Sequence, residues 1–209
     1  EDAQGEVYFN DVPDSKTFRI GADGKPAVFL EDSKKGDGQA FGPDGRLYVT
    51  TEASNSVQIL DPRTNTVVDT LPTGQKESHM LALSPDGRAA YTSNVGAGTV
   101  SVIDVATKKV TAVVTVAARA QRIALSPDGR FVFTADQDAP RLAVVDTKTN
   151  KIAPGVPLPG VAYGTAPTPD GRGLALGWDD EESAAGIARF SDADARAYLK
   201  FRATLGRIA

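Results

Sequence analysis

The sequence predicts an all-β fold, namely a β-propeller of five blades, each a four-stranded antiparallel sheet. The first observation is a Pro-Asp-Gly turn whose proline recurs at positions 43, 85, 127 and 169, a constant spacing of 42 residues. A period of this length is the signature of a repeat architecture. The second observation is that short runs rich in Val, Ile, Thr and aromatic residues alternate with Gly, Pro, Asn and Asp. This pattern predicts many short strands joined by turns, and four such strands per radial repeat make a propeller blade.

The third observation is that the two ends of the chain fit the same repeat. Gly206–Ala209 resembles Gln121–Ala124, and the opening EDAQGEVYF resembles LSPDGRFVF. The turn glycines divide the chain into units of 40, 42, 42 and 42 residues, with 43 wrapped through the termini; these glycines are Gly5, Gly45, Gly87, Gly129 and Gly171. We therefore expect one domain, residues 1–209, whose ring is closed by the C-terminal strand pairing with the N-terminal blade. Closure leaves no unpaired blade edge inside the ring. The expected blades are approximately residues 5–44, 45–86, 87–128, 129–170, and 171–209 together with 1–4.

The second unit illustrates the expected elements of each repeat. Its strands are predicted at Leu47–Thr50, Ser56–Leu60, Thr66–Leu71 and His79–Leu83. Asp61–Asn65 is predicted to form a turn, because an Asp side chain can cap its own turn and Asn tolerates positive φ. The third and fourth units repeat this arrangement.

The fifth unit matches the repeat least well. Leu174–Trp178 and Gly186–Phe190 fit its first two strands, and Ala197–Arg202 is expected as the third. The segment 191–209 also has the pattern of a helix capped by Ser191 or Asp192. The length match favours the strand. If the helix forms instead, the ring is open or is closed by another molecule.

Composition excludes several classes of function. A net charge of −4 and a pI near 5.1 argue against a nucleic-acid partner, which needs a basic face. The absence of Cys excludes disulfides, thiolate catalysis and Cys-ligated metals. No apolar run has the length of a membrane span. A signal sequence is not recognisable at the start, so either none existed or it has been removed. We expect a monomer that binds a small molecule or a protein, with neither nucleic acid nor membrane as partner.

The repeats resemble two propeller families. Units two to four resemble the YVTN-type, YncE-like repeat through ALSPDGRAAYTSN, GTVSVIDVATKKV, RIALSPDGRFVFTAD and LAVVDTKTNKI. The first unit, EVYFNDVPDSKTFRIGADGKPAVFLEDS with GQAFGPDGRLYVT, is similar to the gluconolactonase and regucalcin family. The first resemblance implies seven blades and the second six, whereas this chain has five units. Together they imply a propeller fold and favour an extracytoplasmic location.

Candidate ligand-binding residues lie just before each innermost strand, where a propeller lines one mouth of its central channel. The repeat places polar side chains there at equivalent positions, with Gly206 completing the ring; these residues are Asp37, His79, Gln121 and Tyr163. A concave centre with convergent polar groups is the usual place for a ligand. The alternative is that these side chains, an ordinary part of the repeat, only solvate the mouth.

A second set of candidates follows the first strand of each unit, on the same face. The set comprises Asn10-Asp11, Thr51-Glu52, Asn94, Asp136 and Trp178-Asp179. Carboxylate and amide oxygens are the ligands that Ca²⁺ prefers, so Ca²⁺ or another divalent cation is a candidate cofactor. The alternative is that these residues are solvated loop ends.

The gluconolactonase resemblance implies a divalent cation at the channel mouth and hydrolysis of sugar lactones. In that family an Asn-Gly before an innermost strand supplies one ligand, and Asp37-Gly38 takes that place here. Asp37 is therefore the candidate metal ligand, and His79 is a candidate ligand or general base. Three functions stay open: a non-catalytic binding or scaffold propeller, which is preferred; a metal-dependent lactonase-like hydrolase; and an engineered or excised propeller with no evolved function.

Overall fold

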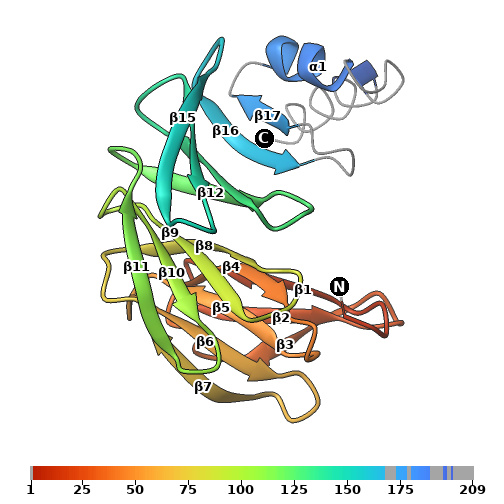
Figure 1. The fold of residues 1–209 in the computed structure, drawn as a ribbon. Coiled ribbons are helices and arrows are strands. Elements are labelled where there is room, and N and C mark those ends of the chain that lie inside the picture. Colours follow the sequence, from red (N-terminus) through yellow and green to blue (C-terminus); the bar gives the residue numbers. More distant parts are fainter. Residues whose placement is uncertain (1, 168–172, 178–179, 189–194, 197–198, 200–209) are drawn as a thin grey trace.

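The structure is a computed structural model of the chain that describes residues 2–167, 173–177, 180–188, 195–196 and 199. Its strands are joined into antiparallel sheets in chain order (Figure 1). The first sheet holds three strands, β1 (Val7–Asp11), β2 (Lys16–Ile20) and β3 (Pro26–Leu30). The next holds four, β4 (Gly36–Phe41), β5 (Leu47–Thr51), β6 (Ser56–Asp61) and β7 (Thr66–Pro72).

Two further four-stranded sheets repeat the arrangement of the second. One holds β8 (Ser78–Leu83), β9 (Ala89–Asn94), β10 (Thr99–Asp104) and β11 (Lys109–Thr115). The other holds β12 (Ala120–Leu125), β13 (Phe131–Asp136), β14 (Arg141–Asp146) and β15 (Lys151–Pro157). A two-stranded sheet follows, made of β16 (Ala162–Pro167) and β17 (Gly173–Gly177). The all-β class is confirmed, and three of the described sheets have the four antiparallel strands predicted for a blade.

The sheets pack against one another through their first strands. β4 contacts β8, β8 contacts β12, and β12 contacts β16. The second strand β5 is buried along its whole length, whereas β7 on the outside is largely exposed. The first strands therefore lie innermost, as the propeller prediction requires. Each four-stranded sheet begins with the last strand of one repeat unit and continues with three strands of the next.

The strands predicted for the second unit are confirmed to within one residue at each end. The predicted turns have the expected cause. Asp146 Oδ1 accepts the backbone N–H groups of Lys148 and Thr149, at 3.0 Å in both cases. Asn150 closes this turn with a φ of 54°, a left-handed conformation that Asn adopts more readily than most residues.

Each hydrophobic cluster joins two neighbouring sheets. Between the second and third sheets, Tyr48, Val57 and Leu71 pack with Leu81 and Ile103. Equivalent clusters lie between the first and second sheets and between the third and fourth. Complete burial of one such aliphatic side chain contributes about 1.5–3 kcal/mol. Because every cluster needs both sheets, no sheet has a core of its own.

The N-terminal sheet starts with a turn found in the other blades. The Gly5 N–H donates to the Asp2 carbonyl at 3.1 Å, as the Gly45 N–H donates to the Gly42 carbonyl at 3.0 Å. Gly5 and Gly45 have φ values of 81° and 74°, a region that favours glycine. The expected likeness of the N-terminus to the repeat is therefore present in the backbone. The segment expected to pair beside β1, Gly206–Ala209, lies outside the described residues, so ring closure stays a prediction.

The fifth unit differs from the prediction. β17 confirms most of the strand expected at Leu174–Trp178. The strand expected at Gly186–Phe190 is wrong, because Asp180–Ala188 forms the helix α1 (Figure 1). Its sequence, DEESAAGIA, has strong helix formers in Ala and Glu, and its acidic residues lie at the N-terminal end, where the helix dipole favours them.

Little of the segment 191–209 falls within the described residues. Ala195, Arg196 and Leu199 have helical backbone there. Leu199 is the one described residue of the strand expected at Ala197–Arg202, and its helical backbone disagrees with that expectation. Across the described ranges, no helix is long and apolar enough to cross a membrane.

Candidate functional site

The inner strands bring the predicted mouth residues to one level. Asp37, His79, Gln121 and Tyr163 each occupy the second position of β4, β8, β12 and β16. Because these strands contact one another in succession, the first three side chains lie side by side. The side chain of Tyr163 is outside the described part of the structure. We call this end of the inner strands the mouth.

Hydrogen bonds between sheets hold the backbone of the mouth residues. The Asn10 side-chain amide donates to the Asp37 carbonyl at 2.7 Å. Thr50 and Ser93 donate their hydroxyl hydrogens to the carbonyls of His79 and Gln121, respectively. In each case a residue of β1, β5 or β9 fixes the first strand of the next sheet.

Gly38 permits the close approach of β4 and β8. A Cβ built at this position would lie 2.6 Å from the Met80 Cα and 2.9 Å from the His79 carbonyl oxygen. Both distances are shorter than real Cβ contacts, so a larger residue would separate the strands. The glycine after Asp37 therefore brings the Asp37 carboxylate to the His79 ring.

Asp37, Glu52 and His79 form a compact cluster, named here the mouth cluster. The His79 Nε2 lies 2.8 Å from the Asp37 Oδ2 and 3.6 Å from the Glu52 Oε1. One ligand atom from each residue lies within 4.8 Å of the others, as a shared metal ion would require. Desolvation by burial raises the pKa of Glu52, and the charge of Asp37 adds to that effect, whereas His79 lowers it.

The two nitrogens of His79 have different surroundings. The residue is only 9% exposed, and its Nδ1 is buried with no hydrogen-bond partner among the described residues. The Nε2 faces both carboxylates. A neutral ring with its proton on Nε2 donates to Asp37, whereas the other neutral tautomer, with its proton on Nδ1, directs an Nε2 lone pair toward the two carboxylates. His79 is thus arranged to share a proton or a metal ion with them.

Two glutamines extend the mouth cluster toward the fourth sheet. The Gln121 Nε2 lies 3.4 Å from the His79 Nε2, and the Gln137 Nε2 donates to the Gln121 Oε1. Gln137 was not among the sequence candidates, because the 42-residue spacing aligns it with Ala53 and not with Glu52. The strand ends show the likeness instead, since Gln137 directly follows β13 as Glu52 directly follows β5.

The remaining candidates have partners away from the mouth cluster. Asn94 is fully buried, accepts from Ser78 at 2.9 Å and donates to Ser101 at 2.9 Å. Asp136 is 3% exposed and accepts from the Arg141 Nε at 3.2 Å. Asp11 caps its own turn, while Trp178 and Asp179 lie outside the described residues. Among the described members of the two predicted sets, the structure therefore gathers Asp37, Glu52, His79 and Gln121.

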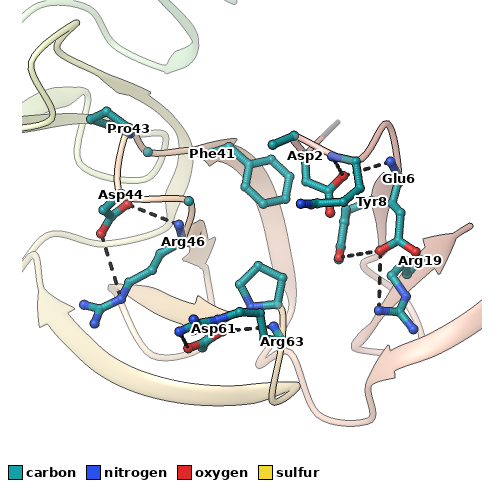
Figure 2. Close-up of a pocket in the computed structure, with 15 residues that line it drawn as sticks. Asp2, Glu6, Tyr8, Arg19, Phe41, Pro43, Asp44, Arg46, Asp61 and Arg63 are labelled. Atoms are coloured by element: carbon teal, nitrogen blue, oxygen red, sulfur yellow. Dashed lines mark hydrogen bonds and ion pairs between the residues drawn. The ribbon is translucent and has the colours of Figure 1, made fainter.

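A separate cavity of about 860 Å³ lies at the opposite end of the inner strands (Figure 2). The turns at Asp2–Glu6, Gly42–Arg46 and Asp61–Arg63 line it. Its arginines are paired: Arg19 lies 3.4 Å from Glu6 and Arg63 lies 2.8 Å from Asp61. Hydrogen bonds from Arg63 lower the pKa of Asp61 to about 2. The charged side chains of the cavity are thus paired with one another. At the mouth, by contrast, two carboxylates converge on one histidine.

Solved structures support the fold. The hydrazine synthase of Kuenenia stuttgartiensis matches with 24% identity and a TM-score of 0.63, over 67% of this chain and 41% of that one. A catalytically inactive virginiamycin B lyase from Staphylococcus aureus with quinupristin matches with 15% identity and a TM-score of 0.72, over 85% and 61%. The selenomethionine-substituted virginiamycin B lyase from the same organism matches with 14% identity and a TM-score of 0.73, over 86% of this chain and 62% of that one. The chain therefore spans less than two thirds of each of these proteins, and identities this low support the fold alone.

Sequence comparison identifies the family. No curated protein matches the chain. The family profile described as "Cytochrome D1 heme domain" matches residues 43–176, a range that includes all four Pro-Asp-Gly turns, Glu52 and His79. Because this match covers more than half of the sequence and agrees with the propeller sheets, the chain belongs to the cytochrome D1 heme domain family.

Proposed function

We propose that this chain is a binding propeller that holds a divalent cation in the mouth cluster and presents it to a small molecule. The observation that carries the proposal is the convergence of the Asp37, Glu52 and His79 ligand atoms within 4.8 Å. These residues come from β4, the end of β5 and β8, so the geometry depends on two packed sheets. Two adjacent carboxylates repel each other, and a cation between them removes that repulsion.

The ligand set favours a transition metal over the Ca²⁺ expected from the sequence. Ca²⁺ prefers six to eight oxygen ligands, whereas an imidazole with two carboxylates suits Zn²⁺, Mn²⁺ or Fe²⁺. Three protein ligands leave at least one coordination position for water or a ligand. That open position is where a small molecule would bind.

The residues around His79 do not fit a heme, the group implied by the family name. A heme held by His79 needs a ring nitrogen that faces a cavity wide enough for the macrocycle. The His79 Nε2 instead faces Asp37 at 2.8 Å and Glu52 at 3.6 Å, and its Nδ1 is buried. The cavity of about 860 Å³ is lined by residues other than histidine, methionine and cysteine. The proposed chemistry therefore uses no heme.

Metal binding provides the direct test. We expect the purified protein to bind Zn²⁺ or Mn²⁺ with one-to-one stoichiometry in isothermal titration calorimetry. Asp37→Asn or His79→Ala should weaken binding by more than the roughly 10–100-fold that follows loss of a residue supporting a ligand. Asp14→Asn is the matched control, because it removes the same charge from an exposed turn. Equal binding by all four proteins would exclude the site.

A metal-dependent lactone hydrolase is the second candidate. The open coordination position favours it, since a cation there can polarise a carbonyl and activate water. Hydrolysis of a sugar lactone by the metal-loaded protein, lost in Asp37→Asn, would establish this activity. Metal binding without turnover would leave the binding propeller. An absence of both would favour a scaffold without an evolved ligand.

The finer points of the fold belong to the same proposal. We propose five blades and a ring closed by Gly206–Ala209 beside β1, supported by the repeat turn at Asp2–Glu6. The YVTN-type and gluconolactonase-like resemblances and the monomeric state are proposals of the same kind. Removal of residues 204–209 should lower the melting temperature if this segment closes the ring.

A further inference from the structure

We infer that the small molecule bound at the mouth carries a carboxylate, with one oxygen on the cation and the other accepting a hydrogen bond from the Gln121 amide. This inference rests on the cation site proposed above. It is carried by the Gln121–Gln137 pair, which lies beside the mouth cluster and supplies none of its ligand atoms.

The Gln121 amide has a defined orientation at the edge of the mouth cluster. Gln137 donates to the Gln121 Oε1, so this oxygen faces away from the cluster. The Gln121 NH₂ group faces His79, with the two Nε2 atoms 3.4 Å apart. An amide NH₂ donates hydrogen bonds and does not ligate a metal. Gln121 is therefore a donor at the edge of the site.

A cation on His79 would leave the Gln121 N–H without an acceptor on the imidazole ring. In the free protein, an Nε2 proton directed to Asp37 leaves no lone pair on this nitrogen to accept from Gln121. A cation bound at Nε2 leaves none either, so the Gln121 N–H needs another acceptor. Leaving a half-buried donor unsatisfied is costly. An oxygen atom of an added ligand, on the open side of the cation, satisfies it.

Charge selects the class of ligand. A divalent cation with Asp37 and Glu52 has no net charge, and the nearby charges of Glu77 and Lys35 act on Glu52 in opposite directions. A singly charged acid leaves less excess charge in this site than a dianionic phosphate does. A carboxylate also provides two oxygens, one for the cation and one for the Gln121 N–H.

The repeat explains why, among the described residues, the fourth sheet offers carboxamides where the second and third sheets offer metal ligands. Gln137 directly follows β13 as Glu52 directly follows β5, and Gln121 stands 42 residues after His79. The second and third sheets thus contribute carboxylates and imidazole, which bind a cation. The fourth sheet contributes two carboxamides at the same positions, which orient a ligand oxygen.

Co²⁺ provides a spectroscopic test with the intact chain. Its visible absorption reports a change of ligands on the ion, so we would titrate the Co²⁺-loaded protein with acetate. We expect a saturable spectral change in the wild type. Gln121→Leu should keep Co²⁺ binding within about threefold and weaken acetate binding about tenfold or more, as for a hydrogen bond to a charged group. Gln137→Leu should weaken acetate less, because it only frees the Gln121 amide to turn over.

Two controls separate the possible outcomes. Gln4→Leu makes the same change at an exposed turn and should bind acetate as the wild type does. Methyl acetate, a neutral probe of similar shape, should leave the spectrum unchanged. The inference is wrong, while the cation site stands, if the protein binds Co²⁺ but not acetate. The same holds if Gln121→Leu binds acetate as the wild type does, or if methyl acetate binds as well as acetate. If Co²⁺ itself does not bind, both proposals fall.

Discussion

Thr50 in β5 donates its hydroxyl hydrogen to the backbone carbonyl of His79 in β8, which belongs to the next sheet. The bond is buried, and the same hydroxyl also lies 3.1 Å from the Gly38 carbonyl oxygen. One side chain thus contacts the backbone on which two members of the mouth cluster depend. Thr50, which is not a candidate ligand, therefore helps to hold the backbone of the mouth cluster in place.

Thr50→Val should destabilise the fold and loosen the site. The substitution keeps the side-chain shape and leaves a buried carbonyl without its donor, which costs about 1–3 kcal/mol. For a domain of this size we expect the melting temperature to fall by roughly 2–4 °C per kcal/mol. Calorimetry should also show weaker metal binding. Ser93→Ala is the control, because Ser93 makes the equivalent bond to Gln121 and should lower stability alone.

Gly38→Ala should separate β4 from β8 at the mouth. The added methyl group would meet the Met80 Cα at 2.6 Å, and overpacking of this kind costs about 1–3 kcal/mol. Metal affinity should fall because Asp37 moves away from His79. Gly45→Ala is the contrast: its Cβ meets nothing within 4 Å but its φ of 74° is strained for alanine. It should therefore lower the melting temperature and leave metal affinity unchanged; equal metal loss in both variants would contradict the packing argument.

Glu52→Gln should stabilise the metal-free protein at neutral pH. Burial raises the pKa of Glu52 above its ordinary value of 4.5, so the folded state binds its proton more tightly than the unfolded state does. The stability linked to that proton is present at low pH and is lost as the pH rises through the folded pKa. In the presence of chelator, the melting temperatures should be similar near about pH 4. Toward about pH 8 the variant should become the more stable, because it lacks the carboxylate whose ionisation burial disfavours, while its metal binding is lost.

Asn94→Ala should affect stability without affecting the site. Asn94 is fully buried, and its amide bonds to Ser78, Thr99 and Ser101. Removing it leaves these hydroxyls with fewer partners, and we expect a loss of about 2–4 kcal/mol in the free energy of unfolding by urea. Metal affinity of the folded fraction should stay at the wild-type value. A specific loss of metal binding would instead return Asn94 to the ligand set.

The sequence allowed accurate prediction wherever the repeat was regular. The strands of the second unit were placed to within one residue because turn residues such as Asp61 and Asn65 have local causes. The fifth unit failed at Gly186–Phe190, where the repeat length suggested a strand but Ala and Glu favour the helix α1. Repeat spacing states where an element should fall, and local propensity decides which element forms there.

The site was only partly predictable for a related reason. The period aligned Asp37 with His79, since both begin inner strands. It could not show which loop side chains turn inward. Glu52 reaches the His79 ring, whereas Asn94 and Asp136 turn toward buried partners of their own sheets. Gln137 was missed because its role depends on the contact with Gln121, which spacing alone does not specify.

The order of residues at the mouth has a consequence for how such a protein changes its ligand. Asp37, His79 and Gln121 stand at one position of successive repeats, on backbones held by the same kind of bond between sheets. A substitution at any of them alters the chemistry offered to the ligand and leaves the supporting bond in place. The side chains at these positions can therefore change one at a time, and the specificity of the mouth can change with them, while the backbone that carries them stays the same.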